Sequence, residues 1–422
     1  MERFASAREA VDWINGLRWK GEKKGLENTK ALLAALGHPE ERMGKILHVA
    51  GTNGKGSTCA FLDAALRQCG CRVGLFTSPY LRRFNERIVF DGKAIGDGEL
   101  VSVASEVKQA AEALSQNGIY CTTFELLTAC ACLYFAGKGC EYSVMEVGMG
   151  GRLDSTNVLP SAVSVIAAIG MDHMQSLGNT LELIASEKAG IMKPGRPAVV
   201  MPAEENVMRV FRKSAESAGA DLYVADEPAL ISQSEGGSLF ACKLPVLGEI
   251  RQKITLAGLH QTKNACLALS ALDLLGVDMI RAMRGVENAK WAGRLDLRGN
   301  VLVDCAHNPQ GAATLKEYVE RFVAGRKKVL LTGMMKDKQI EACSRLLGSF
   351  ADEVVTTQVS WPRAIGAEEL KAFYPRGALS CPNVEEALET AKKLAGEDGL
   401  VVAAGSVYLA GDVINILEGN GL

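Results

Sequence analysis

The sequence predicts an α/β protein of two domains, each built on strands joined by crossover helices. Short apolar runs alternate with segments of helical periodicity, which is typical of βα units in a parallel sheet. The 422 residues suffice for two or three hydrophobic cores. Glycine is frequent, at 44 residues, and indicates tight turns of the kind that approach phosphate groups.

The first domain is expected to span residues 1–297 and to contain a mostly parallel sheet. Its predicted strands are Ile46–Ala50, Val73–Thr77, Tyr142–Val147, Val163–Ile169 and Ala198–Met201. The helices predicted with them are Ser57–Gln68, Glu99–Ala113, Phe124–Phe135, Leu181–Ala189 and Asn206–Ala218. From Asp221 to Leu259, short strand-like segments and an EGG turn predict a small antiparallel insertion, and Gln261–Leu275 returns to helix.

A second βα series follows the segment WAGRLDLRGN, at 291–300, which we interpret as a connector. Its predicted strands are Val301–Cys305, Lys328–Gly333, Glu353–Thr357 and Leu400–Ala404, each followed by a helix-compatible segment. The boundary is therefore expected near 297, with a smaller second domain over residues 298–422.

Composition excludes several classes of protein. The 47 basic and 49 acidic side chains give a net charge of −2, so charge gives no reason to expect binding to nucleic acid or a membrane surface. No run approaches the ~18 apolar residues that span a bilayer, and the N-terminus lacks the apolar core of a signal peptide. The 12 cysteines are scattered without a C-x-x-C pair. They predict reduced thiols in a cytoplasmic protein rather than disulfides or a zinc site.

A phosphate-binding loop is predicted where the first strand meets its helix. Strand, glycine-rich turn and helix follow one another, and such a turn directs backbone N–H groups and the helix N-terminus at phosphate oxygens. The pattern departs from the usual one, because Val49 replaces its first glycine and a glycine separates the lysine from the serine. The predicted nucleotide-binding residues of this loop are Gly51, Thr52, Asn53, Gly54, Lys55, Gly56 and Ser57.

Segments along nearly the whole chain resemble the folylpolyglutamate synthase and dihydrofolate synthase family of the Mur ligase superfamily. Those that carry the resemblance include GTNGKGS (51–57), GLFTSPYLRRFNERI (74–88), EVGMGGRLDSTNV (146–158), DHMQSLGNTLELIASEKAGIMKPG (172–195), GLHQTKNACLAL (258–269) and DCAHNP (304–309). The resemblance implies a Mur-ligase-like domain that binds ATP and folate. It also implies a smaller, Rossmann-like glutamate-ligase domain, with the active site between the two.

The activity implied by this resemblance is amide ligation. ATP phosphorylates a carboxylate of the pterin substrate, a folate or dihydropteroate, and the amine of L-glutamate attacks the acyl phosphate, releasing ADP and phosphate. The sequence does not separate polyglutamylation of tetrahydrofolate from synthesis of dihydrofolate, because both use the same catalytic residues. The resemblance suggests a monomer.

A magnesium site is expected at the ends of the strands. Glu146 closes an apolar strand, where a carboxylate points out of the carboxyl edge of the sheet. By resemblance, Ser78, Glu146 and His173 are Mg²⁺ ligands, although a histidine ligand is unusual for magnesium. The resemblance also implies that Lys188 is catalytic and carbamylated, so that it holds a second magnesium. From the residues alone, Lys188 is an ordinary exposed helix lysine.

The remaining expected site residues also come from the resemblance. Those that match ATP-contacting positions are Asn264, Arg294 and Asp304. Lys55 and His307 are expected to be catalytic, with His307 near the incoming glutamate. The residues expected to contact the pterin substrate are Thr122, Thr123, Phe124 and Arg152. From the residues alone, the segment DCAHNP is a turn with a helix N-cap, and Phe124 is as readily a core residue.

Two other functions fit a nucleotide site. A Mur-type ligase acting on a cell-wall precursor shares the same chemistry, but the glycine after Lys55 and the TSPYL segment favour the folate branch. A GTPase-like switch or other nucleotide-binding module is the second alternative. The absence of an N-K-x-D guanine motif from the sequence argues against it.

Overall fold

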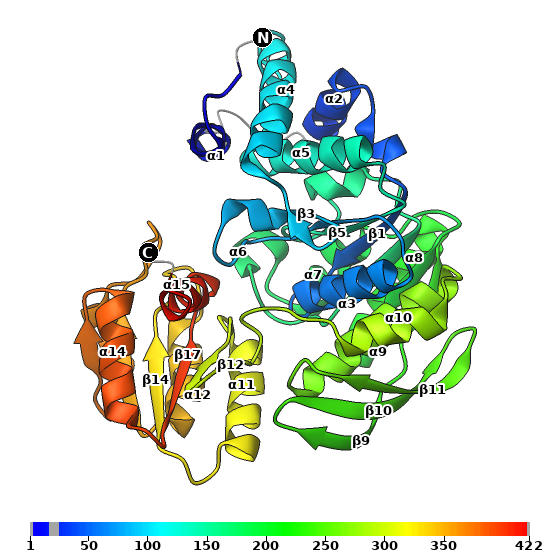
Figure 1. The fold of residues 1–422 in the computed structure, drawn as a ribbon. Coiled ribbons are helices and arrows are strands. Elements are labelled where there is room, and N and C mark those ends of the chain that lie inside the picture. The colour runs from blue at the N-terminus through cyan, green and yellow to red at the C-terminus, as the bar shows by residue number, and fades with distance from the viewer. Residues whose placement is uncertain (1–2, 17–24, 420–422) are drawn as a thin grey trace. The chain divides into compact units, whose positions relative to one another are not determined.

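The structure is a computed structural model that describes residues 3–16 and 25–419 (Figure 1). Strand β1 (Lys45–Ala50) lies inside its eight-stranded sheet. The strand order is β4-β3-β2-β5-β1-β6-β7-β8. The six strands from β2 to β8 in this order pair in parallel, and only β3 and β4 are antiparallel. The bounds of the other strands are β2 Val73–Phe76, β3 Ile88–Phe90, β4 Lys93–Ala94, β5 Tyr142–Glu146, β6 Val163–Ile166, β7 Pro197–Val200 and β8 Asp221–Val224.

Helices cover both faces of this sheet (Figure 1). The helices α1 (Ala7–Gly16), α2 (Glu27–Ala35), α4 (Asp97–Ser115) and α5 (Thr123–Lys138) form a core with Ile46, Phe76 and Met145 on one face. On the same face, α7 (Leu181–Ala189) and α8 (Glu205–Ala218) pack on β6 and β7. The opposite face carries α3 (Lys55–Gln68), against which α10 (Met279–Glu287) packs.

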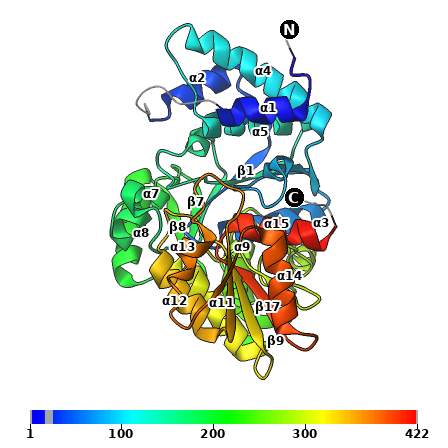
Figure 2. The same ribbon diagram turned by 90° about the vertical axis from the view of Figure 1, so that its left-hand side faces the viewer.

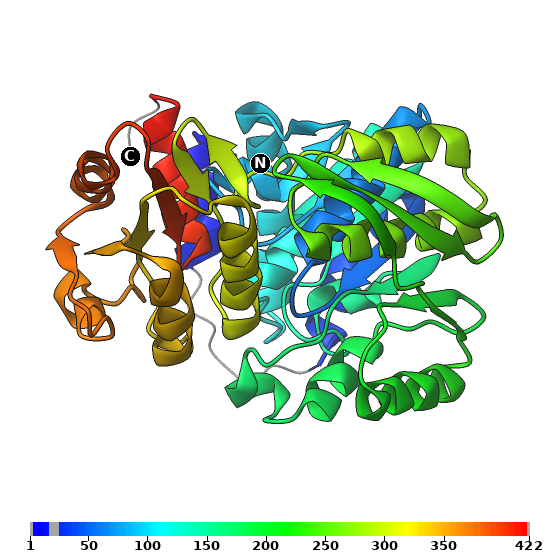
Figure 3. The same cartoon turned by 90° about the horizontal axis from the view of Figure 1, so that it is seen from below.

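A separate three-stranded sheet follows β8, and Figure 3 shows its strands side by side. Its strands are β9 (Ala229–Ser234), β10 (Gly237–Leu244) and β11 (Gly248–Ile254). Their short connections permit only antiparallel pairing, because a parallel crossover needs a dozen or more residues. The predicted antiparallel insertion is thus confirmed for these strands. It is wrong for β8, which extends the large sheet in parallel with β7, Pro197 facing Asp221.

The second βα series forms a six-stranded sheet of order β12-β13-β17-β14-β15-β16. Its strands are β12 Asp296–Arg298, β13 Val301–Val303, β14 Lys328–Thr332, β15 Glu353–Thr357, β16 Leu379–Cys381 and β17 Leu400–Ala404. Figure 2 shows α14 (Val384–Ala395) and α15 (Val407–Leu417) on one side of it, and α11 (Pro309–Phe322) and α12 (Ile340–Phe350) on the other. A short α13 (Ala367–Lys371) precedes β16.

The chain divides into two units that each pack mainly within themselves. The first holds the described residues up to Ile231, with Leu239–Ile254 and Gln261–Ala289; the second holds Ser232–Ser238, Thr255–His260 and the described residues from Lys290 on. The second unit takes over after Ala289, which is earlier than the predicted boundary near 297. The segment 291–300, predicted as a connector, contains β12, and β12 belongs to the second unit because it pairs with β13. Tyr318 Oη donates to the carbonyl of Glu235 at 2.8 Å, which explains why the Ser232–Ser238 segment belongs to the second unit.

The predicted strands and helices named above are confirmed with small shifts at their ends. Sequence analysis missed the helices α1, α2 and α10 and four short strands. The missed strands are β3, β4, β12 and β16, of two or three residues each. Such segments are too short to show an alternation of apolar and polar residues. Among the described residues, none of the helices is both long and apolar enough to cross a membrane.

A close contact between β2 and α5 generates a stability prediction. A Cβ atom at Gly74 would lie 2.6 Å from Cγ of the buried Phe135. We expect Gly74→Ala to lower the free energy of unfolding by about 1–3 kcal/mol, because the ring or the strand must shift. Urea denaturation measures the change.

The matched control is Gly137→Ala in α5, where a Cβ atom meets nothing within 4 Å. Alanine is favoured over glycine inside a helix, so this variant should gain about 0.5–1 kcal/mol. A loss of stability at Gly137 equal to that at Gly74 would contradict the packing explanation.

Candidate active site

The register of three parallel strands brings the predicted phosphate loop and the predicted metal ligand to one edge of the sheet. Val49 of β1 faces Glu146 of β5, and Ala50 faces Ile166 of β6. The carboxyl ends of these strands therefore lie side by side. Loops that leave this edge are where open α/β sheets bind ligands.

The loop Gly51–Gly54 connects β1 to the N-terminus of α3. The backbone N–H groups of Thr52 and Asn53 donate to the carbonyl of Ala168 at 2.7 and 3.3 Å, which ties the loop to the chain after β6. Gly54 has a φ of +86°, and a Cβ atom there would collide with the side-chain oxygen of Asn264. Glycine is thus required at the start of a helix whose first N–H groups have no acceptor within the helix and suit an anion.

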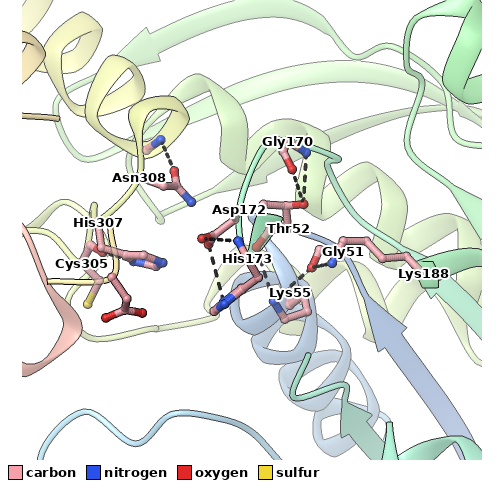
Figure 4. A network of polar contacts seen from close by, with 12 residues as sticks. Gly51, Thr52, Lys55, Gly170, Asp172, His173, Lys188, Cys305, His307 and Asn308 are labelled. Carbon is pink, nitrogen blue, oxygen red and sulfur yellow. Dashed lines mark hydrogen bonds and ion pairs between the residues drawn. The ribbon is translucent and has the colours of Figure 1, made fainter. Parts of the chain in front are cut away.

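Two lysines meet at the carbonyl oxygen of Gly51 (Figure 4). Lys55 Nζ lies 3.1 Å from this oxygen and Lys188 Nζ lies 2.9 Å from it. Lys188 is only 4% exposed, so the expectation of an exposed helix lysine, taken from the residues alone, is wrong. Burial and the nearby charge of Lys55 lower the pKa of Lys188 to about 7, although Asp172 and Asp154 act in the opposite direction. A substantial fraction of this amine is therefore neutral near pH 7.

Two of the three predicted magnesium ligands lie together. Glu146 is 4% exposed, and its Oε2 accepts the backbone N–H of Ser78 at 2.9 Å. His173 has a left-handed backbone with φ of +50°, and its Nε2 lies 3.8 Å from Asp172 Oδ2. Sequence analysis did not select Asp172. A buried carboxylate beside a serine offers the oxygen donors that Mg²⁺ prefers, so Glu146 and Ser78 fit the ion.

Another possible metal-binding group lies on the 3₁₀ turn before β1. Within residues 3–16 and 25–419, His38, Glu40 and Glu41 form the one group of three histidine, cysteine or acidic residues whose ligand atoms all lie within 4.8 Å of one another. Sequence analysis did not predict it. None of the expected magnesium ligands belongs to this group.

Gln261 joins two predicted nucleotide residues and was missed by sequence analysis. Its Nε2 donates to Ser57 Oγ at 3.2 Å, and its Oε1 accepts Asn264 Nδ2 at 3.0 Å. All three side chains are buried. The three-residue spacing of Gln261 and Asn264 on α9 (Leu259–Leu274) was the available signal, because it places both on one helix face.

The residues expected to contact the pterin have structural partners as well. Thr122 caps α5 in a reciprocal capping box with Glu125, and Thr123 Oγ1 donates to the carbonyl of Ile14 at 3.0 Å. The ring of Phe124 lies 5.8 Å from that of Phe76. The expectation that Phe124 packs in the core is therefore confirmed in part.

Arg152 is placed differently from a free carboxylate-binding group. Its Nη2 lies 2.7 Å from Glu187 Oε1, and its Nε lies 3.1 Å from the same oxygen. Glu187 precedes Lys188 on α7. A substrate carboxylate would have to compete with this ion pair for the guanidinium group.

In the second unit, Asp304 organises the turn that follows β13. Its carboxylate accepts the backbone N–H of Leu295 at 2.9 Å and that of Ala306 at 2.8 Å. Burial raises the pKa of this carboxyl, and the nearby guanidinium of Arg294 offsets part of the effect. His307 Nδ1 lies 2.9 Å from the carbonyl of Cys305. The expected turn with an N-cap is confirmed, because Asn308 caps α11 ahead of Pro309.

Comparison with known proteins identifies the family. Residues 49–272 match the Mur ligase middle domain, and residues 293–407 match the Mur ligase glutamate ligase domain. The dihydrofolate synthase/folylpolyglutamate synthase of Bacillus subtilis is 36% identical over 97% of this chain and 99% of its own length. The chain belongs to the folylpolyglutamate and dihydrofolate synthase branch of the Mur ligase family.

Solved structures of this Mur ligase branch share the fold. A Mycobacterium tuberculosis folylpolyglutamate synthase complexed with ADP has a TM-score of 0.90 and 29% identity, over 97% of this chain and 98% of that one. An Escherichia coli FolC in complex with DHPP and ADP has a TM-score of 0.88 and 28% identity, over 98% of both chains. The predicted fold class and family are confirmed.

The Gly54 contact predicts a specific loss of nucleotide binding. An alanine in the left-handed conformation costs about 1–2 kcal/mol, and at Gly54 it must also displace Asn264. We expect Gly54→Ala to weaken binding of a non-hydrolysable ATP analogue at least about tenfold, a change of about 1.4 kcal/mol. Isothermal titration calorimetry measures it.

Gly70→Ala is the matched control, because Gly70 has the same φ of +86° and a Cβ atom there meets nothing within 4 Å. This variant should lose stability and keep its nucleotide affinity. Equal affinity losses in the two variants would show that strain alone, rather than the contact with Asn264, accounts for the effect.

Proposed function

We propose that this protein ligates L-glutamate to a folate through an acyl phosphate, with conversion of ATP to ADP and phosphate, and that dihydropteroate is also a substrate. The observation that carries the proposal is the pair of lysines, Lys55 and Lys188, on the carbonyl of the phosphate loop. Burying the amine of Lys188 costs free energy, and binding a nucleotide alone does not require a second lysine at this position. The names of the relatives support the folate branch over a cell-wall ligase.

The chemistry explains why cations gather at this edge of the sheet. A carboxylate repels nucleophiles and has no good leaving group, and phosphorylation removes both obstacles. The protein must then hold the phosphates and the substrate carboxylate together and neutralise their charge. We assign the phosphates to Lys55 and to the backbone N–H groups at the start of α3.

The residues proposed to hold magnesium are Ser78, Glu146 and His173. When bound, the ion supplies positive charge to the phosphate oxygens during transfer. A solved relative from Yersinia pestis is described as complexed with AMPPNP and Mn ion, which supports a divalent metal in this family. Glu146 holds the backbone of Ser78, so the two residues would be oriented together.

Lys188 is proposed to react with CO₂. Its neutral amine forms a bond to the carbon, one proton leaves the nitrogen, and the product is a carbamate anion. The pKa of about 7 supports this step, because it supplies the neutral amine that the reaction requires. Carbamylation replaces a buried cation with an anion that can hold a second magnesium ion.

The other expected roles are part of the same proposal. Asn264, Arg294 and Asp304 are assigned to ATP, and His307 to the incoming glutamate. The residues assigned to the pterin substrate are Thr122, Thr123, Phe124 and Arg152. The first domain would bind ATP and folate, and the second would act as the glutamate-ligase domain.

We further propose a cytoplasmic monomer whose partners are its small-molecule substrates. All 12 cysteines are free thiols, and reduced thiols are typical of the cytoplasm. The net charge of −2 supports the absence of a nucleic-acid partner.

The proposed ligase should release phosphate only when all its substrates are present. With ATP and L-glutamate, we expect phosphate release and a glutamyl product on tetrahydrofolate and also on dihydropteroate. Phosphate assay and mass spectrometry of the product measure both. Hydrolysis of ATP at the same rate without pterin and glutamate would indicate a nucleotide switch and overturn the proposal.

Lys188→Ala should abolish ligation without unfolding the protein, because the amine that forms the carbamate is lost. We expect turnover to fall by about 10³-fold or more, the scale of losing an electrostatic stabiliser of the transition state. ¹³CO₂ labelling with NMR should give a carbamate signal in the wild type only. Lys213→Ala, at an exposed position of α8, is the control and should retain both. Wild-type turnover by Lys188→Ala, with or without bicarbonate, contradicts the assignment.

A further inference from the structure

Four consecutive polar residues after β5 are buried, which is uncommon for such side chains. They are Asp154, Ser155, Thr156 and Asn157, here called the DSTN segment, and each is at most 8% exposed. Buried polar groups are costly unless they form hydrogen bonds. The partners of this segment lie on several different elements, so the segment connects them.

Two of these connections reach helices that carry proposed site residues. Ser155 Oγ lies 2.7 Å from Thr128 Oγ1 of α5. Asn157 Nδ2 donates to the carbonyl of Gly190, directly after α7, at 2.9 Å. Lys193 Nζ in turn donates to Asn157 Oδ1 at 2.8 Å. The DSTN segment therefore bridges α5 and the end of α7.

The third connection reaches β1 through a directed chain of hydrogen bonds. Thr156 Oγ1 lies 2.6 Å from Asp154 Oδ1 and 2.8 Å from His48 Nε2. A carboxylate only accepts, so the single hydroxyl hydrogen of Thr156 is donated to Asp154, and Thr156 accepts from Nε2–H of His48. This assigns the proton of the imidazole to Nε2. His48 is fully buried, and burial lowers its pKa to about 3, so the ring is neutral.

The chain ends on the loop that follows β5. Asp154 Oδ2 accepts the backbone N–H of Met149 at 3.0 Å. The same loop touches two proposed site residues through its glycines. A Cβ atom at Gly148 would lie 2.5 Å from the ring of Phe124, and one at Gly151 would lie 3.0 Å from Cα of Lys188. A shift of the loop would therefore alter the surroundings of both.

We propose that His48 and Thr156 are positioning residues that hold the loop 148–154 in the geometry needed for the pterin substrate. Neither residue touches the reacting atoms. His48 acts through Thr156 on Asp154, and Asp154 fixes the loop backbone. The inference rests on the proposed function, because it assigns the loop a role in binding that substrate.

Packing alone does not explain a histidine at this position. The neighbouring residues of β1, Ile46, Leu47, Val49 and Ala50, are apolar and buried. His48 Nδ1 is buried with no hydrogen-bond partner among the described residues, a cost that an apolar side chain of similar shape avoids. The Nε2–H donor is what distinguishes histidine here.

The experiment compares Thr156→Val, His48→Leu and His48→Gln. Valine and leucine remove the hydrogen bonds, whereas the amide N–H of glutamine replaces Nε2–H. We expect the first two to raise KM for the pterin substrate about tenfold, the scale of one buried hydrogen bond, with KM for ATP unchanged. His48→Gln should restore KM to within about threefold of the wild-type value. The remaining difference in binding free energy is then smaller than the contribution of one buried hydrogen bond.

Ser143→Ala is the matched control. It removes one buried hydrogen bond, from Ser143 Oγ to the carbonyl of Met43 at 2.6 Å, near the start of β5. The control should lower stability without changing KM for the pterin substrate. If Ser143→Ala and Thr156→Val shift KM equally, the role of the chain is merely structural and the inference is overturned.

A second readout does not depend on activity. Amide hydrogen exchange of peptides covering 148–154 should accelerate in Thr156→Val and His48→Leu, and should not change in Ser143→Ala. If the wild type is active but exchange in Thr156→Val and His48→Leu is unchanged, the inference is overturned and the proposed function stands. A wild-type protein that ligates no pterin substrate overturns the proposed function, whatever the exchange shows.

Discussion

The parallel pairing of β1 between β5 and β6 is the constraint on which the site depends. Val49 opposite Glu146 and Ala50 opposite Ile166 leave three chain segments at one edge of the sheet. The phosphate loop, the buried carboxylate and the loop to His173 start from these strand ends. A slip of one residue would reverse the faces of the side chains on β1 and separate the partners.

The carbonyl oxygen of Gly51 brings two lysine side chains together at this edge. It accepts from Lys55 and Lys188, so two potential cations are held near the site proposed for phosphate. Burial lowers the pKa of Lys188, and the nearby charge of Lys55 lowers it further. The result is a lysine suited to chemistry rather than to a surface ion pair.

Buried polar groups in the first unit serve the same edge. Gln261 links Ser57 with Asn264 beneath the phosphate loop, and the DSTN segment links β1, α5 and the end of α7. A network of buried hydrogen bonds restricts motion more than apolar packing alone, because hydrogen bonds are directional. The first unit thus holds its proposed site residues by backbone register and by fixed hydrogen bonds.

The sequence by itself determined the α/β class, the phosphate loop and the family, because these depend on local patterns and on the order of motifs. It also placed Glu146 at the carboxyl end of a strand, the edge at which open α/β sheets bind ligands. It did not determine that β8 joins the large sheet or that β12 is a strand, since pairing partners decide both. Only the tertiary structure decided that Lys188 is buried against Gly51, that Arg152 is paired with Glu187, and that His48 donates to Thr156. Each of these depends on contacts between segments far apart in the chain, and no local pattern encodes them.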